Sequence, residues 1–136
     1  MATAFPATTQ RPYYPVSRNT GLLIAAEAVA FALASTVHFI TGFTDAAIPE
    51  LVIAAILSLG SAAVLFRHPR AWGMALAATT AATLGTALGL SIIAAGRQDA
   101  PDLTFHAAAL TALAATLVIL SRDRRRRGQE RNGSEP

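Results

Sequence analysis

The sequence predicts an all-α fold, an antiparallel up-and-down bundle of four transmembrane helices. Of the 136 residues, 53% are hydrophobic and 14% are charged, whereas a soluble domain carries about 25% charged residues. The apolar residues fall into four segments, 21–43, 47–66, 71–95 and 101–120, and each is long enough to cross the hydrocarbon core as a helix. Short connections between them permit only an up-and-down order, so the lipid bilayer is the expected partner.

The first segment, residues 21–43, reads as a retained helix. A signal peptide is the alternative, because Arg18 precedes the apolar run and Ala32-Leu33-Ala34 has the small-residue form of a cleavage site. However, Glu27 lies inside the run, and the run continues beyond that site to Phe43. We therefore expect the helix to remain in the mature protein.

The later segments have recognisable boundaries. Asp45 and Pro49-Glu50 open the second segment, where Asp45 is expected to cap the helix. The turn at 67–70 leads to the third segment, and Pro101-Asp102 opens the fourth. In the third segment, Gly85 and Gly89 have the spacing that lets two helices approach closely. They indicate either packing within the bundle or the interface of a homo-oligomer.

The basic residues predict the orientation. All eleven are arginines. With the N-terminus inside, ten lie on the cytoplasmic face: Arg11, Arg18, Arg67, Arg70 and the six after Ser121. Only Arg97 lies on the other face. This bias places both termini in the cytoplasm and indicates topology rather than nucleic-acid binding, so no nucleic-acid partner is expected.

The terminal segments are polar. Residues 1–20 are expected to form a flexible cytoplasmic tail, and residues 122–136 a disordered, arginine-rich cytoplasmic tail. The alanine- and arginine-rich composition without lysine is typical of a GC-rich bacterial genome. We therefore expect a multi-pass protein of the bacterial cytoplasmic (inner) membrane, with residues 21–121 as its transmembrane domain.

Glu27 and His38 are the polar residues of the first segment, and both need partners inside a membrane. They are eleven residues apart, so they lie within about 20° of each other on the helix and about 16 Å apart along its axis. Ser58, Ser61 and Thr79 have the depth to meet Glu27. Glu27 is then a buried polar group bonded to a hydroxyl or a backbone carbonyl, or else a proton carrier or ligand contact.

We expect His38 and His106 at the same depth in the membrane, because His38 lies near the end of the first segment and His106 near the start of the fourth. Asp102 lies one turn from His106, and Glu50 lies near the same rim. Histidine and carboxylate ligands suit transition metals, and two opposed histidines can hold a haem iron. The cluster could also bind a substrate or proton, or its hydrogen bonds could serve only to hold the helices together. His68, in the turn at 67–70, is expected to be solvated.

Several kinds of chemistry are excluded by the residues. There is no cysteine, so disulfides, thiolate metal sites and thiol redox chemistry are ruled out. No serine–histidine–carboxylate pattern or HExxH motif is present. Classical hydrolysis is therefore not expected, and the sequence assigns no catalytic residue.

Taken together, five features resemble a group of small, uncharacterised four-helix bacterial integral membrane proteins. They are Glu27 and His38, Pro49-Glu50, GTALG in the third segment and PDLTFH at the start of the fourth. The resemblance covers about residues 18–122 and implies the four-helix fold but no activity. The chain is similar to DoxX-like proteins in helix count alone.

These observations predict a small integral membrane protein with a histidine–carboxylate cluster near its outer face. It would bind a metal at His38, His106, Asp102 and Glu50 or a haem at His38 and His106, or be a subunit around such a centre in a larger membrane complex. The alternatives are a structural or accessory subunit without a ligand and a small dimeric transporter.

Overall fold

The computed structural model describes residues 16–96 and 100–132, and this part of the chain forms four α-helices. They are α1 (Arg18–Thr41), α2 (Thr44–Leu65), α3 (Ala71–Gly96) and α4 (Ala100–Asn132). Each contains a stretch long and apolar enough to cross a membrane. This confirms the prediction of an all-α membrane protein with four candidate spans. Most of the expected flexible tail, 1–15, and part of the third connection, 97–99, lie outside the described residues.

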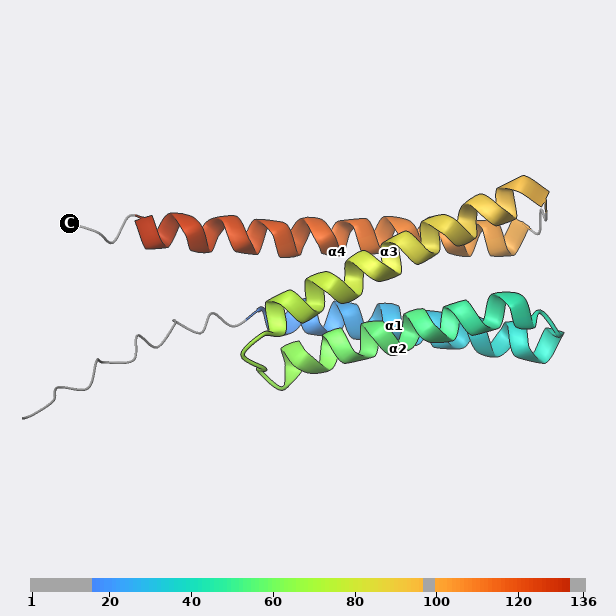
Figure 1. Cartoon of the computed structure of the whole chain (residues 1–136), viewed down its shortest axis with the longest axis horizontal. Coiled ribbons are helices and arrows are strands. Elements are labelled where there is room, and N and C mark those ends of the chain that lie inside the picture. The colour runs from blue at the N-terminus through green and yellow to red at the C-terminus, as the bar shows by residue number, and fades with distance from the viewer. Residues whose placement is uncertain (1–15, 97–99, 133–136) are drawn as a thin grey trace, which may run out of the picture.

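The helices run up and down in sequence order, so the start of α1 and the end of α4 lie at the same end of the molecule (Figure 1). Helices α1 and α2 form an antiparallel pair, and α3 crosses from that pair to α4. A smaller contact between α1 and α4 closes the bundle. This closure brings polar residues of α1 and α4 together, as described below.

The ends of α1 and α2 differ slightly from those expected. Gly42 has a φ of 83°, a left-handed conformation that glycine adopts without steric cost. The N–H groups of Gly42 and Phe43 bond to the carbonyls of Phe39 and His38, which ends α1 at Thr41. Helix α2 then begins at Thr44. Asp45 therefore lies in the first turn of α2 and is not its cap, which corrects the sequence-based expectation.

Small residues allow the helices to pack closely. A β-carbon on Gly60 of α2 would lie 2.7 Å from the β-carbon of Ala78 on α3. One on Gly85 would lie 3.2 Å from Ile53, and one on Gly89 would lie 3.4 Å from His106. Both glycines of the GTALG motif thus face other helices of the same chain. They serve packing within the bundle.

Apolar residues occur both inside and outside the bundle. Those that are fully enclosed include Ile24, Phe31, Leu57, Leu113 and Leu120. Many large apolar side chains are exposed, among them Leu33, Ile40, Leu59, Leu84 and Ile92. A continuous apolar exterior on all four helices is what a bilayer, rather than water, would stabilise.

Helix α4 is longer than the sequence predicts. It was expected to end near Leu120 and to be followed by a disordered tail, but it continues to Asn132 (Figure 1). Hydropathy falls at Ser121, where the charged residues begin, yet the following arginines, glutamine and glutamate are good helix formers. Extending an existing helix also avoids the cost of a new nucleus. The apolar segment and the helix therefore end at different residues.

Candidate functional site

Three helices contribute to a cluster at the end of the bundle opposite the start of α1 and the end of α4. His38 lies in the last turn of α1, Glu50 lies in the second turn of α2, and Asp102 and His106 lie in the first two turns of α4. The up-and-down order places these helix ends at the same level (Figure 1). We call these four residues the histidine–carboxylate cluster.

The four side chains form a closed ring in which imidazoles and carboxylates alternate. His38 Nδ1 lies 2.7 Å from Glu50 Oε2, and His106 Nδ1 lies 3.0 Å from Asp102 Oδ1. Two longer distances complete the ring: 3.7 Å from His38 Nε2 to Asp102 Oδ1, and 3.9 Å from His106 Nε2 to Glu50 Oε1. Each histidine therefore faces both carboxylates.

The hydrogen bonds assign the tautomer of each neutral histidine. His106 Nδ1 also lies 3.0 Å from the backbone carbonyl oxygen of Asp102, and a carbonyl can only accept, so Nδ1 carries the proton. With an ionised Glu50, whose carboxylate can only accept, His38 Nδ1 is likewise the donor across their 2.7 Å contact. Both Nε2 atoms then present lone pairs, and each faces a carboxylate oxygen. Such acceptor–acceptor contacts need a cation or a further proton between them.

Burial differs across the cluster. The side chains of Glu50 and His106 are only 3% and 8% exposed, whereas those of His38 and Asp102 are 16% and 23% exposed. Glu50 Oε1 is buried and has no hydrogen-bond partner among the described residues. The cluster thus has an enclosed inner side at Glu50 and an accessible outer side at Asp102, through which a small ion could enter.

Neighbouring residues shape the surroundings of both imidazoles. The ring of Phe105 meets His106 edge-on at a centroid distance of 5.4 Å, and Phe43 meets His38 in the same way at 6.3 Å. Gly89 leaves space beside His106 Nε2. Aromatic walls exclude water, and an atom that water cannot reach depends on its protein partners or on a bound ion.

The structure brings together all four residues that the sequence analysis named for a metal site, His38, His106, Asp102 and Glu50. Ligand atoms of His38, Glu50 and Asp102 lie within 4.8 Å of one another. His106 lies outside this group, although its Nδ1 is 3.0 Å from Asp102 Oδ1 and its Nε2 is 3.9 Å from Glu50 Oε1. His68 lies elsewhere, in the turn after α2, where its Nδ1 accepts a hydrogen bond from the backbone N–H of Arg70.

Glu27 lies deeper in the bundle and has a partner that the sequence analysis missed. Thr116 of α4 donates a hydrogen bond of 2.7 Å to Glu27 Oε1, while Glu27 Oε2 and Thr79 Oγ1 are buried without partners among the described residues. The expected partners bond elsewhere, since Ser58 donates to Ala54 and Ser61 to the carbonyl of Gly21. Spacing could have indicated Thr116. It follows His106 by ten residues, nearly the interval from Glu27 to His38.

The geometry favours a small ion over a haem. Each Nε2 atom faces a carboxylate oxygen at less than 4 Å, so a porphyrin could not lie between the imidazoles without displacing Asp102 and Glu50. Comparison with protein-family models, curated proteins and solved structures finds no match for this chain. The chemistry of the cluster therefore carries the functional conclusion.

Proposed function

We propose that this multi-pass membrane protein binds one divalent transition-metal ion at the histidine–carboxylate cluster. The ligands are His38 Nε2, His106 Nε2, Asp102 Oδ1 and Glu50 Oε1. The observation that carries the proposal is Glu50 Oε1, which is buried, has no hydrogen-bond partner in the described part of the chain and lies 3.9 Å from His106 Nε2. A cation between these atoms would satisfy both.

The distances are compatible with this proposal. Ligands about 2 Å from a tetrahedral ion lie about 3.3 Å from one another. The two acceptor–acceptor distances, 3.7 and 3.9 Å, exceed this slightly. His38, Glu50 and Asp102 offer ligand atoms within 4.8 Å of one another, and His106 would have to turn from its Nδ1 contact with Asp102 to complete the set. Two nitrogens and two oxygens suit zinc, iron or manganese. The bond from His38 Nδ1 to Glu50 Oε2 orients the first ligand through its other nitrogen.

A purely structural cluster is the competing candidate, and the direct 2.7 Å contact between His38 and Glu50 favours it. In that case a proton on one imidazole would replace the ion, and the ring would fix the positions of α1, α2 and α4. The two candidates differ in one measurable quantity, the metal bound per chain.

The test is titration of the full chain in detergent with zinc, after chelator treatment, followed by calorimetry and elemental analysis. We expect one ion per chain and an affinity loss of at least about 10-fold for His38→Ala, His106→Ala and Glu50→Gln. The matched control is His68→Ala, which removes an exposed histidine outside the cluster and should bind as the unmodified chain does.

The combined variant keeps the proposal falsifiable. If His38 and His106 hold the same ion, the double alanine variant should bind no more weakly than the weaker of the two single variants. Zinc should also raise the unfolding temperature of the unmodified chain but not that of the variants. The measurement is made at a zinc concentration that saturates a typical protein zinc site. Less than about one bound ion per ten unmodified chains would then establish that the cluster is purely structural.

The orientation and location are part of the same proposal. We infer a bacterial cytoplasmic membrane with both termini inside, which places the cluster near the outer face. The distribution of arginines supports it, because those at 18, 67, 70, 122, 124 and 125 all lie at the end where α1 begins and α4 ends. Acidic residues at 45, 50 and 102 lie at the opposite end. An ion entering through Asp102 would then come from the periplasmic side.

A further inference from the structure

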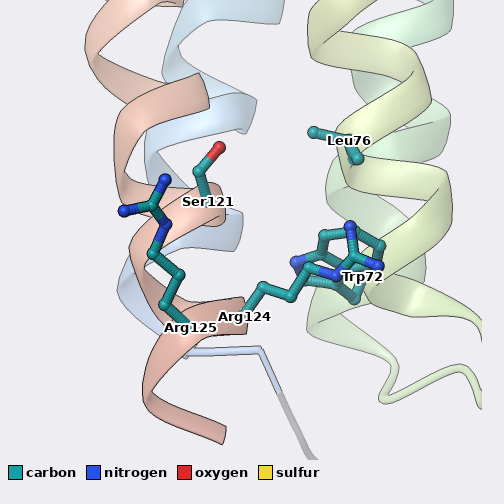
Figure 2. Close-up of a pocket in the computed structure, with 5 residues that line it drawn as sticks. All are labelled: Trp72, Leu76, Ser121, Arg124 and Arg125. Atoms are coloured by element: carbon teal, nitrogen blue, oxygen red, sulfur yellow. The ribbon is translucent and has the colours of Figure 1, made fainter. Parts of the chain in front are cut away.

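A cavity of about 480 Å³ lies between α3 and α4 at the arginine-bearing end of the bundle (Figure 2). Trp72 and Leu76 line it from the first turns of α3, and Ser121, Arg124 and Arg125 line it from α4. We call this cavity the tryptophan–arginine pocket. It lies at the opposite end of the bundle from the histidine–carboxylate cluster.

Trp72 connects the two helices that form the pocket. Its indole N–H donates a hydrogen bond of 3.2 Å to the carbonyl oxygen of Leu120, which ties α3 to α4. The guanidinium carbon of Arg124 lies 5.2 Å from the centre of the Trp72 ring, within the range of a cation–π contact. Stacking on the ring orients Arg124 but leaves its N–H groups available to a further acceptor.

The pocket carries the positive charge of two arginines, which follow Asp123 in the sequence. The ion pairs among the described residues all involve His38 or His106, so neither Arg124 nor Arg125 is paired with a described carboxylate. Figure 2 shows Arg125 rising beside Ser121 and Arg124 extending toward Trp72. Arg124, Arg125 and Ser121 all line the pocket, and their donor groups match the oxygens of a phosphate group. In Figure 2 the guanidinium group of Arg124 lies at Trp72 and that of Arg125 lies on the other side of Ser121, so Arg125 would turn toward a bound phosphate.

We propose that the tryptophan–arginine pocket binds the phosphate group of an anionic phospholipid. Arg124, Arg125 and Ser121 donate to the phosphate oxygens, and Trp72 and Leu76 pack against the adjoining glycerol and the first part of an acyl chain. This site is independent of the metal proposal and rests only on the membrane-spanning character of the helices.

The position of the pocket favours a lipid over a soluble phosphate. Ser121 is where the apolar part of α4 gives way to charged residues, so the pocket lies at the level of lipid headgroups. Beside it, one turn before Ser121 on α4, Val118 exposes apolar surface. An acyl chain leaving the pocket would lie against this surface, whereas a soluble phosphate would make no use of it.

The test is native mass spectrometry of the delipidated full chain with added dioleoyl phosphatidylglycerol or dioleoyl phosphatidylcholine. We expect the anionic lipid to bind more tightly. The variant Arg124→Gln/Arg125→Gln should lose about 10- to 30-fold of that affinity, because each basic residue at an anionic surface contributes about a factor of five. The matched control is Arg67→Gln/Arg70→Gln, which removes two arginines at the same end but outside the pocket and should change the affinity less than about twofold.

Two further measurements separate the lipid from other sources of phosphate. Glycerol 3-phosphate at millimolar concentration should not displace the lipid, and Trp72→Leu should weaken lipid binding without removing a charge. Displacement by glycerol 3-phosphate, equal binding of the two lipids, or equal losses in the pocket and control variants would each overturn the proposal.

Discussion

Glu27 and Thr116 form a polar contact deep in the bundle, where an unpartnered carboxyl group is costly. The histidine–carboxylate cluster lies one layer further along the same face of α1, about 16 Å away by helix rise. Phe31, which is fully buried and meets Phe105 edge-on, lies between the two layers. At the residue scale, these two polar sites on α1 are therefore separated by the ring of Phe31 and by the buried hydroxyl of Ser35, which donates to the carbonyl of Ala47.

The contact between Thr116 and Glu27 gives a prediction about stability. Glu27→Gln retains an oxygen that can accept from Thr116, so the free energy of unfolding should change by less than about 1 kcal/mol. Glu27→Leu leaves the buried hydroxyl of Thr116 without this acceptor and should be more destabilising. Thermal unfolding in detergent, followed by circular dichroism, measures both changes.

Threonine variants provide the control for that prediction. Thr116→Val removes the donor to Glu27 and should cost about 1–3 kcal/mol. Thr111→Val, one to two turns earlier in α4, removes an exposed hydroxyl that bonds only to the carbonyl of Ala107, and it should have little effect. Equal destabilisation by the two valine variants would show that the contact with Glu27 contributes nothing.

The sequence predicts which side chains meet where their depth in the bundle is the only thing that determines the contact. The positions of His38, Glu50, Asp102 and His106 relative to helix ends are sufficient to place them at one level, and the structure has them in contact. Hydroxyl partners are harder to predict. Ser61, Thr79 and Thr116 all have suitable depths for Glu27, and the choice among them depends on helix rotation and tilt, which come from packing.

At the scale of the elements, the contact between α2 and α3 depends on Gly60. Gly60→Ala places a methyl group 2.7 Å from the β-carbon of Ala78, so the two backbones must separate, at a cost of about 1–3 kcal/mol. Gly73→Ala, near the start of α3, meets nothing within 4 Å and should be neutral or stabilising by up to about 1 kcal/mol. Unfolding temperatures of the two variants in one detergent test this difference.

A compensating variant distinguishes overpacking from a general intolerance of Gly60 to substitution. Ala78→Gly removes the atom that the new methyl group would meet, so Gly60→Ala/Ala78→Gly should recover much of the lost stability. If the double variant is no more stable than Gly60→Ala alone, this contact does not set the distance between α2 and α3.

Helix boundaries show what hydropathy can and cannot predict. The four apolar segments locate the four helices because only a helix satisfies its own backbone in lipid. They do not locate the last residue of α4, since Arg122 and the residues after it are polar but still favour a helix. The role of Trp72 was also missed, because its partners Leu120 and Arg124 are distant in sequence.

At the scale of the whole molecule, the two ends of the bundle differ in charge and in chemistry. One end carries the described arginines and the tryptophan–arginine pocket, and the other carries Asp45 and the histidine–carboxylate cluster. An even number of helices brings α1 and α4 back to the arginine-bearing end. The anionic inner surface of a membrane would attract this end, while the acidic end would face the opposite compartment.

The topology prediction follows from this asymmetry. Reporter fusions after Arg70 and after Ser121 should both report a cytoplasmic location, and a fusion near Arg97 should report the far side. Because arginines near helix ends determine the orientation, replacing Arg67 and Arg70 by glutamine should leave the topology unchanged as long as the C-terminal arginines remain. Removing both sets should give a mixed orientation, detectable as activity of both a cytoplasmic and a periplasmic reporter at one fusion site. A periplasmic C-terminus in the unmodified chain would mean that one of the four helices does not cross the membrane, or that the whole bundle is inverted. A fusion at the N-terminus separates these two outcomes, since only inversion moves the N-terminus to the periplasm.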